Sequence, residues 1–580
     1  MREKVYSDKK GTKRSSTRSS VDRISNRKPP GRQSYGADEG DVSKLAKKLK
    51  SSASKDDIEV DCAFGYRFVN FIHVFTTLSE ILVCKKCAGS VTFTESNIRG
   101  LGFKIVVKCK QCEITTIESS PLINRAYDIN RRITFAMRLI GIGMQGINKF
   151  CAFMCLPNSV YQKAYDDIVK CIATGTEAVK SVVLRDAVEE EKKISEEYGQ
   201  NEGLSVSGDG SWRKRGFSSL FGFASLIGWY TGKVLDILVK SKYCKECEHW
   251  EKKKDTAEYE EWQSLHENNC HVNHSGSAGK MEPDAVVEMF SRSEDAYEVR
   301  YAFYIGDGDS KTFKSIQDAK PYDDFSVTKK ECIGHVQKRM GTRLRNLKKG
   351  AKNLGGRGKL TGKLIDELSI YYGLAIRRNT DSIQNMRKEI YATLYHKIST
   401  DENPQHDRCP EGEESWCSWQ RAKASNNLQM HSHKPAMTKE VFDAVEPIYK
   451  DLTNEDLLSR CLGGFTQNAN ESLNAVVWSI APKSVASGKL IVDIATGIAV
   501  ITYNNGFQGL LHVMNTIQLK INTRLYDYAI DVDKHRVKAA NRSESINRKE
   551  ARKDRTAFRK ETQQHHEHVE GQLYGAGSAE

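Results

Sequence analysis

The 580-residue sequence lacks any apolar run long enough to form a membrane-spanning helix. No stretch approaches the roughly 20 consecutive apolar residues that cross a bilayer, and the N-terminus is polar and basic rather than a secretory signal peptide. Hydrophobic residues still make up 39% of the chain, which is enough to bury a sizeable core. These features predict a soluble, intracellular protein with about two to four domains and no membrane partner.

A disulfide framework is also not expected, although the chain has 15 cysteines. Thiols stay reduced inside cells, where closely spaced cysteines are more often metal ligands. Most of the cysteines lie in short-spaced groups with another cysteine or a histidine in polar surroundings. No internal repeat is evident. The cysteine spacing therefore predicts metal sites rather than cross-links.

The net charge of +14 favours a polyanionic partner, and its distribution says more than its size. Residues 1–35 hold 11 Lys or Arg against 3 acids, among many serines. This composition predicts that residues 1–57 form a disordered basic arm. Within the arm, the stretch KKGTKR is either a nuclear import signal or a solvated tail. We expect a nuclear protein on the first interpretation.

Two CxxC pairs near the N-terminus have the spacing of a tetrahedral zinc site. Cys84 and Cys87 form one pair, Cys109 and Cys112 form the other, and 21 residues separate them. Each thiolate pair sits on its own turn, and the intervening sequence suits a hairpin. Residues 58–125 are therefore predicted to form a zinc ribbon, whose partner the sequence does not identify.

A second group of candidate zinc ligands lies further along the chain. Its best set is Cys244, Cys247, His266 and Cys270. Three thiolates and one imidazole suit zinc, but the neighbouring His249, His271 and His274 leave the identity of the fourth ligand open.

A third group leaves two interpretations open. His406, Cys409 and Cys417 could bind another zinc ion with His396 as the fourth ligand. Alternatively, the two cysteines are buried thiols packed under neighbouring tryptophans.

Three acidic residues in distant stretches could hold catalytic metal ions. Asp209 in VSGDGSW and Asp307 in YIGDGDSKTF follow apolar, strand-like runs, and Glu471 in QNANESLN lies at the start of an expected helix. Three such carboxylates are what two-metal phosphoryl transfer requires. Each one, taken singly, also fits an ordinary turn residue. Asp309 competes with Asp307 if the preceding strand ends later.

The order of expected elements around these acids indicates an α/β fold. Three strands with short turns follow residue 203, and a helix and a fourth strand ending at Asp307 come later. This is the order of a ribonuclease H-like core, in which the first Asp lies on the first strand and becomes a neighbour of the second. The expected organisation begins with a helical region at 126–200 that could bind DNA. A catalytic domain follows at 201–515, with a zinc insert at about 243–275 and a helical insertion at about 340–465. A charged C-terminal helix or tail at 516–580 ends the chain.

A basic stretch without any acid lies inside the expected insertion. From Val336 to Lys363 there are ten Lys or Arg and no Asp or Glu. Solvated helix faces normally interleave Glu with Lys, so this composition favours contact with nucleic-acid phosphates. The candidate DNA-binding residues are Lys338, Arg339, Arg343, Arg345, Lys348 and Lys349.

Several strings, in order, resemble those of the Mutator-like transposases, especially their animal branch. They include VSGDGSWRKRGFSS, NHSGSAGKMEP, YIGDGDSKTF, ECIGHVQKRMGTRLR, CPEGEESWC and TQNANESLNAVVW, and they span residues from about 60 to 515. The resemblance implies a ribonuclease H-like catalytic domain whose Asp-Asp-Glu triad would be Asp209, Asp307 and Glu471. It also implies a CxxH signature, matched here by Cys332 and His335.

The resemblance further implies a DDE transposase that uses two Mg2+ or Mn2+ ions, besides structural Zn2+. Its partners would be double-stranded DNA, as terminal inverted repeats and as target, and further copies of the chain in a synaptic complex. His335 could orient a DNA strand or could be a structural histidine. The competing hypothesis is a domesticated, zinc-dependent DNA-binding or regulatory protein without transposition activity. A structure-specific nuclease without strand transfer is a third hypothesis.

Overall fold

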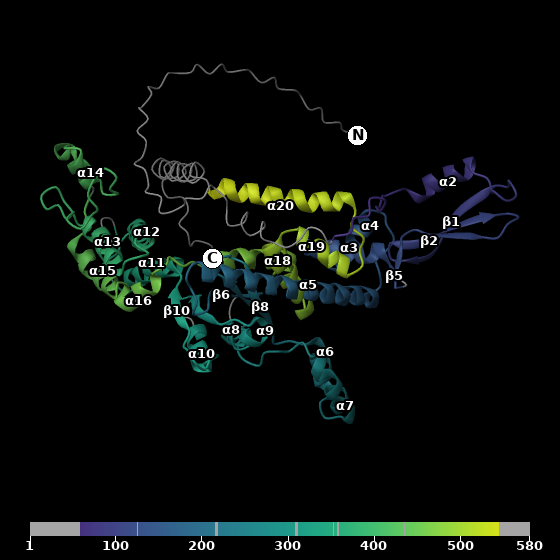
Figure 1. The fold of residues 1–580 in the computed structure, drawn as a ribbon, viewed down its shortest axis with the longest axis horizontal. Coiled ribbons are helices and arrows are strands. Elements are labelled where there is room, and N and C mark those ends of the chain that lie inside the picture. Colours follow the sequence, from purple (N-terminus) through teal and green to yellow (C-terminus); the bar gives the residue numbers. More distant parts are fainter. Residues whose placement is uncertain are drawn as a thin grey trace, which may run out of the picture.

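The computed structural model describes residues 58–544 apart from residues 125, 215–217, 308–310, 352, 357–358 and 434 (Figure 1). The predicted basic arm at 1–57 and the alternative ligand Asp309 lie outside the described residues. The fold is mixed α/β, as expected. A long helix, α5, crosses the centre of the view, with a small β-sheet at one end and a group of helices at the other (Figure 1).

The N-terminal part contains the hairpin that the sequence predicts between the two CxxC pairs. Strands β1 and β2 are antiparallel, and β3 adds to β2 to give a three-stranded sheet. A short helix precedes this sheet, and a two-strand pairing and two helices connect it to α5. The elements are α2 (Phe71–Ile81), β1 (Val91–Arg99), β2 (Gly102–Cys109), β3 (Thr115–Glu118), β4 (Leu122–Ile123), β5 (Ala126–Tyr127), α3 (Asp128–Leu139), α4 (Met144–Phe153) and α5 (Gln162–Glu197).

A five-stranded sheet forms the middle of the protein. Its strand order is β8-β7-β6-β9-β10. The pairs β8·β7 and β7·β6 are antiparallel, and the pairs β6·β9 and β9·β10 are parallel. The strands are β6 (Leu204–Trp212), β7 (Phe221–Gly228), β8 (Val234–Ser241), β9 (Tyr301–Gly306) and β10 (Thr328–Glu331). The three successive antiparallel strands and the later parallel strand are therefore present where the sequence predicts them.

Helices pack against both faces of this sheet. Every residue of β7 is buried, as expected for a strand covered on both faces. One hydrophobic core joins β7 and β8 to α5, α17 and α18, and another joins β6 and β9 to α8. The helices beside the sheet are α8 (Met281–Ser291), α9 (Ser293–Tyr297), α10 (Lys311–Ala319), α17 (Asn468–Ile480), α18 (Lys489–Asn505), α19 (Gln508–Thr516) and α20 (Thr523–Glu544).

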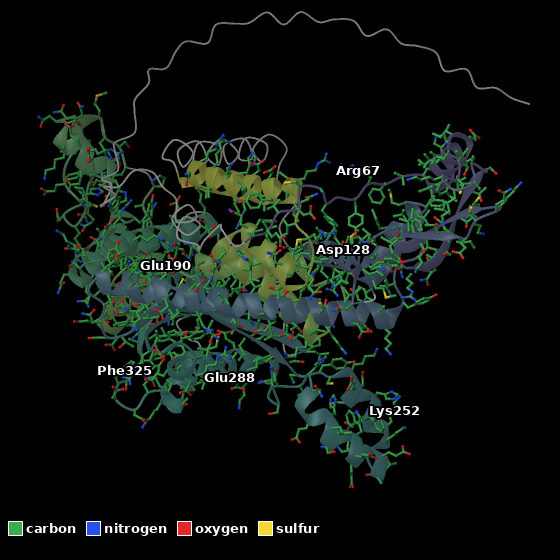
Figure 2. All side chains as sticks on the ribbon, turned by 45° about the vertical axis from the view of Figure 1, so that its right-hand side comes forward. Arg67, Asp128, Glu190, Lys252, Glu288 and Phe325 are labelled. Atoms are coloured by element: carbon green, nitrogen blue, oxygen red, sulfur yellow. The ribbon has the colours of Figure 1, made fainter. Side chains whose placement is uncertain are left out.

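Two segments extend from the sheet as separate modules. The first, between β8 and α8, contains α6 (Lys245–Trp250) and α7 (Ala257–His266). It stands away from the rest of the protein in both views, where Lys252 marks it in Figure 2. The second lies between β10 and α17 and has a hydrophobic core of its own. It comprises α11 (Ile333–Gly350), α12 (Gly362–Arg378), α13 (Ile383–His396), α14 (Ser418–Ala424), α15 (Lys439–Leu452) and α16 (Glu455–Cys461).

None of the helices in the described part of the chain is long and apolar enough to cross a membrane.

Candidate active site and metal centres

Strand pairing brings the first two predicted carboxylates together. Strands β6 and β9 are parallel, and Ser207 on β6 pairs with Ile305 on β9. Asp209 and Asp307 each lie two residues further along, so this register places them side by side at the same edge of the sheet. Because the side chains of a strand alternate between its faces, both carboxylates leave the sheet on the same side.

Helix α17 lies along β6 and brings Glu471 to this edge. Four residues of a helix rise about 6 Å, and two residues of a strand rise about 6.6 Å. Every fourth residue of α17 can therefore contact every second residue of β6. Three hydrogen bonds follow this spacing: Asn470 Nδ2 to Ser207 O (3.1 Å), Asn474 Nδ2 to Asp209 Oδ2 (2.8 Å) and Trp478 Nε1 to Ser211 Oγ (2.7 Å). Glu471 lies in the first turn of the helix, between the first two of these anchors.

Asp209 is the least solvated of the three acids. Burial raises its pKa to about 6, although the hydrogen bond from Asn474 and the charge of His335 act in the opposite direction. The oxygen of the same amide, Asn474 Oδ1, is buried and has no hydrogen-bond partner within the described structure. A partly buried carboxylate beside an unsatisfied amide oxygen is an arrangement that a bound cation would stabilise. Asp307 and Glu471 are 61% and 62% exposed, so solvent or a ligand can reach them.

The CxxH signature lies directly against these acids. Cys332 follows β10 and precedes α11, and its backbone N–H donates to the carbonyl of Gly306, just before Asp307. His335 Nδ1 lies 3.8 Å from Asp307 Oδ1 and 2.8 Å from Gln467 Oε1. The hydrogen bond with Cys332 and the charge of Asp307 raise the pKa of His335 to about 9 against the effect of burial. This raised pKa favours the protonated imidazole, whose charge faces Asp307.

A fourth carboxylate, Glu282, lies beside this site and was missed by the sequence reasoning. It is in the first turn of α8, and Thr312 Oγ1 donates to its Oε1 at 3.3 Å. Burial, together with the charges of Asp209 and Asp307, raises the pKa of Glu282 to about 7. A side chain at Gly210 would have its Cβ 2.8 Å from Glu282 Oε2, so this glycine makes room for the carboxylate. In the sequence, the glycine next to Asp209 indicates that another group approaches the strand there. It does not indicate that this group is Glu282.

The six predicted DNA-binding residues all lie on α11, and four of them form ion pairs with acidic residues of the protein. Four ion pairs link α11 to other elements: Lys338 with Glu471 (3.7 Å), Arg339 with Glu331 (2.9 Å), Arg343 with Asp451, and Arg345 with Asp366 (2.8 Å). The Arg339 side chain is only 17% exposed and its partner is fully buried, so this guanidinium holds α11 against β10. Arg339 is therefore bonded within the protein rather than presented to solvent. Lys348 and Lys349 lie in the last turn of α11.

The four cysteines of the first predicted zinc site converge. Their sulfur atoms lie within 4.8 Å of one another, with 3.8 Å between the Sγ atoms of Cys84 and Cys112 and 3.3 Å between those of Cys87 and Cys109. Backbone N–H groups of the Cys84–Cys87 turn lower the pKa of Cys84 to about 6. Such a turn favours the thiolate, which is the form that binds zinc.

The second predicted site also assembles, and the structure indicates its fourth ligand. The ligand atoms of Cys244, Cys247, His266 and Cys270 lie within 4.8 Å of one another. His266 Nε2 is 3.4 Å and 3.3 Å from the sulfur atoms of the first two, and its Nδ1 is 2.9 Å from Glu246 Oε2. A carboxylate on the other imidazole nitrogen is typical of histidines that bind zinc.

The competing histidines of this region do not join the cluster of ligand atoms. His274 instead contacts the carbonyl of Ser277 and the carboxylate of Asp284, and the ring of His249 packs at right angles to that of Trp250. Among the histidines that could be the fourth ligand on sequence grounds, His266 is the one that lies with the three cysteines.

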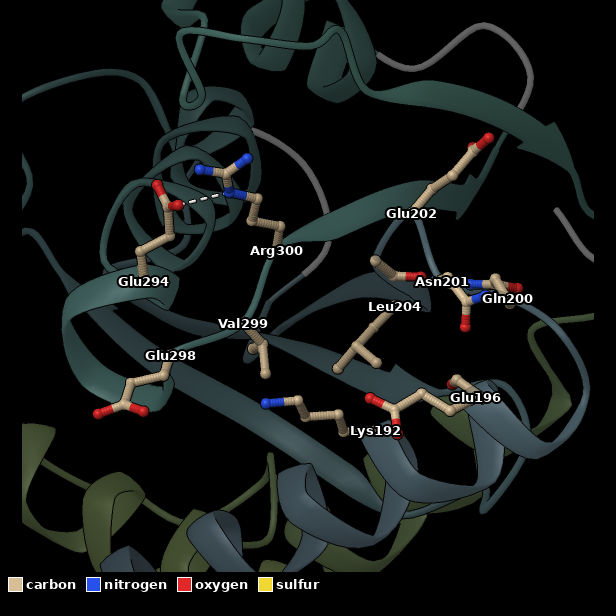
Figure 3. A pocket seen from close by; sticks show the side chains of 12 residues that line it. Lys192, Glu196, Gln200, Asn201, Glu202, Leu204, Glu294, Glu298, Val299 and Arg300 are labelled. Atoms are coloured by element: carbon tan, nitrogen blue, oxygen red, sulfur yellow. Dashed lines mark hydrogen bonds and ion pairs between the residues drawn. The ribbon is translucent and has the colours of Figure 1, made fainter.

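One pocket lies away from the carboxylates. It has a volume of about 480 Å3 and is lined by the end of α5 and the starts of β6 and β9 (Figure 3). Leu204 and Arg300 line it, and Arg300 is paired with Glu294. Since Asp209 and Asp307 lie at the other ends of these parallel strands, this pocket is not part of the candidate active site.

These features together define an α/β protein with carboxylates at a sheet edge and cysteine and histidine clusters in separate modules. A family model described as Mutator-like transposase matches residues 65–417. This match covers more than half of the chain, which therefore belongs to the Mutator-like transposase family. None of the curated proteins compared with the sequence matches it.

Family membership indicates a metal-dependent transposase that binds DNA. The matched range includes Asp209 and Asp307 but ends before Glu471. The assignment of the third carboxylate therefore depends on the position of α17 along β6.

Proposed function

We propose that this protein is a DNA transposase that cuts at the ends of its element and joins them to target DNA. Asp209, Asp307 and Glu471 would hold two Mg2+ or Mn2+ ions. The observation that carries the proposal is the placement of Asp209 and Asp307 on adjacent parallel strands, with α17 and its Glu471 lying along the first of them.

The sheet supports a ribonuclease H-like assignment for the catalytic domain. Three antiparallel strands followed by two parallel ones, in the order β8-β7-β6-β9-β10, are the arrangement that this fold requires. The helical module between β10 and α17 would then be the insertion that precedes the last catalytic acid.

The donor set fits the ions that the family requires. Carboxylate oxygens are the ligands that Mg2+ prefers, and a cation at Asp209 would offset the burial that raises the pKa of this carboxyl. When bound, the two ions would activate the attacking water or 3′-hydroxyl and stabilise the leaving oxygen. The protein's own contribution is to position these groups: Asn474 fixes the carboxylate of Asp209, and His335 fixes that of Asp307.

Two further modules complete the proposal. The cysteines at 84–112 and the ligands at 244–270 would bind structural Zn2+ as a zinc ribbon and a Cys3His site. The two cations in the last turn of α11, Lys348 and Lys349, would contact phosphates of the DNA. We expect the protein to act in the nucleus, as a multimer that holds both element ends.

Strand cleavage tests the catalytic assignment. The substrate is duplex DNA that carries the inverted repeats flanking the gene, incubated with Mg2+ and separately with Mn2+. We expect cleavage at the repeat ends by the wild-type protein, and a loss of at least about 1000-fold in Asp209→Asn and in Glu471→Gln. The control variant is Asp318→Asn, which changes an exposed acid on α10 and should cleave like the wild type.

The outcomes separate the competing functions. Equal cleavage by the wild type and both active-site variants would show that these carboxylates do not act in catalysis. Binding of the repeats without any cleavage or strand transfer would favour a domesticated DNA-binding protein. Cleavage that never leads to joining would favour a nuclease.

A further inference from the structure

Four side chains at the far end of the helical insertion point their ligand atoms at one another. His396 is the last residue of α13, His406 and Cys409 follow in the next loop, and Cys417 directly precedes α14. One ligand atom from each of the four lies within 4.8 Å of all the others. The segment that contains α14 stands out from the rest of the insertion (Figure 1).

The distances between these atoms match a tetrahedral zinc site. With ordinary Zn–N and Zn–S bonds, two nitrogen corners lie about 3.3 Å apart, and a nitrogen and a sulfur corner about 3.6 Å apart. The Nδ1 atoms of His396 and His406 are 3.2 Å apart. The four nitrogen–sulfur distances are 3.4, 3.6, 3.8 and 3.9 Å.

A second row of hydrogen bonds sets the orientation of one of the imidazoles. Asp401 Oδ1 lies 2.5 Å from His433 Nδ1, and His433 Nε2 lies 2.9 Å from His406 Nε2. Asp401 only accepts hydrogen bonds, so His433 donates to it from Nδ1. With both rings neutral, His433 then accepts at Nε2 from His406, which leaves the lone pair of His406 Nδ1 facing the two thiols. This carboxylate–histidine relay behind a ligand is typical of metal-binding histidines.

The alternative, two thiols buried for packing alone, does not account for the size of the local core. The buried apolar cluster here consists of Ala392, Cys409 and Cys417, with Trp416 and Trp419 packed against it. The two tryptophan rings lie against the imidazoles of His396 and His406, with centroids 5.2 and 4.9 Å apart. A core this small needs a metal or another cross-link to hold its segment in place.

We propose that His396, His406, Cys409 and Cys417 form a third, structural zinc site, which fixes the α14 segment to the end of α13. The site is separate from the carboxylates and from the two cysteine-rich sites. It therefore does not depend on the proposed catalytic function.

Zinc content of the purified full-length protein tests this site. After dialysis against Mg2+ to exchange weakly held zinc, we expect three zinc ions per chain in the wild type, measured by mass spectrometry of the metal. The double variant Cys409→Ser, Cys417→Ser should lose one of them. Cys461→Ser is the matched control, because that thiol is buried in the main core of the same insertion and has no place in the cluster. It should keep all three ions.

Equal zinc content in the wild type and the double variant would overturn the proposal. X-ray absorption of the wild type provides a measurement that does not depend on whether the double variant folds. Three sites give nine sulfur and three nitrogen ligands in total, whereas the two cysteine-rich sites alone give seven and one. A ratio near seven to one would also overturn the proposal.

Discussion

Replacing Glu282 by Gln should stabilise the protein, because this carboxylate is held in a place that disfavours its charge. The pKa of Glu282 is raised from 4.5 to about 7 by burial and by the charges of Asp209 and Asp307. This rise in pKa corresponds to about 3 kcal/mol. Since the residue is only partly buried, screening by solvent should reduce the effect to about 2 kcal/mol. Gln has nearly the same shape and can still accept the hydrogen bond from Thr312.

The sign of the effect depends on pH. An acid with a raised pKa binds its proton more tightly in the folded than in the unfolded state, so the folded state loses stability as pH rises. For Glu282 this cost is absent below about pH 4.5, grows up to about pH 7 and is complete above it. The advantage of Glu282→Gln should therefore be about 2 kcal/mol at pH 8 and small at pH 5.

Hydrogen exchange of the β6 and α8 amides measures this effect locally, which matters because a multi-domain chain does not unfold in two states. The free energy of opening should rise in Glu282→Gln at pH 8, in the presence of a chelator. Glu288→Gln, on the same helix, is the control. Its carboxylate is 47% exposed and paired with Lys240, so no gain in stability is expected. A gain of the same size at pH 5 and pH 8, or no gain at all, would refute the electrostatic reasoning.

Three further predictions concern the same region and α11. Gly210→Ala should lower the free energy of local opening by about 2 kcal/mol, because the added Cβ would lie 2.8 Å from Glu282 Oε2; hydrogen exchange of the β6 amides should show much of this loss restored by Glu282→Ala, and additive losses would contradict the contact. Asn470→Ala should cost about 2–4 kcal/mol in the local opening of α17, again measured by hydrogen exchange, because this buried side chain bonds to both β6 and β7; a neutral result would mean that α17 is held by other contacts. Changing Lys348 and Lys349 together to Gln should weaken binding to every DNA sequence and reduce the slope of log K against log salt by about 2; a sequence-selective loss would mean that these residues read bases.

The strands and their order could be predicted because their signals are local. The three strands after residue 203 are apolar runs separated by short turns, and all three are present. Asp209 is the only acid between Gly203 and Leu235, so it had no competitor on the first strand. The position of Glu471 could not be found in this way, since it depends on the alignment of α17 with a strand more than 250 residues earlier.

Contacts between distant elements account for what the sequence could not reveal. The stretch from Val336 to Lys363 contains no acid, which favoured a free cationic surface. Its acidic partners lie outside this stretch, on β10, α12, α15 and α17, and only the fold brings them against it. Glu282 was missed for the same reason. The fourth ligand of the second cluster was ambiguous because several histidines have suitable spacing and only the fold separates them.

The cations of α11 link the insertion to the proposed catalytic centre. His335, near the start of the helix, approaches Asp307, and Lys338, one turn later, approaches Glu471. The insertion therefore places a cation beside two of the three proposed catalytic acids, whereas the carboxylate of Asp209 accepts a hydrogen bond from α17. Because α11 is also packed into the core of the insertion, a shift of the insertion on DNA would move these two cations relative to the sheet. The geometry of Asp307 and Glu471 should then respond to DNA bound by the insertion, and that of Asp209 should not.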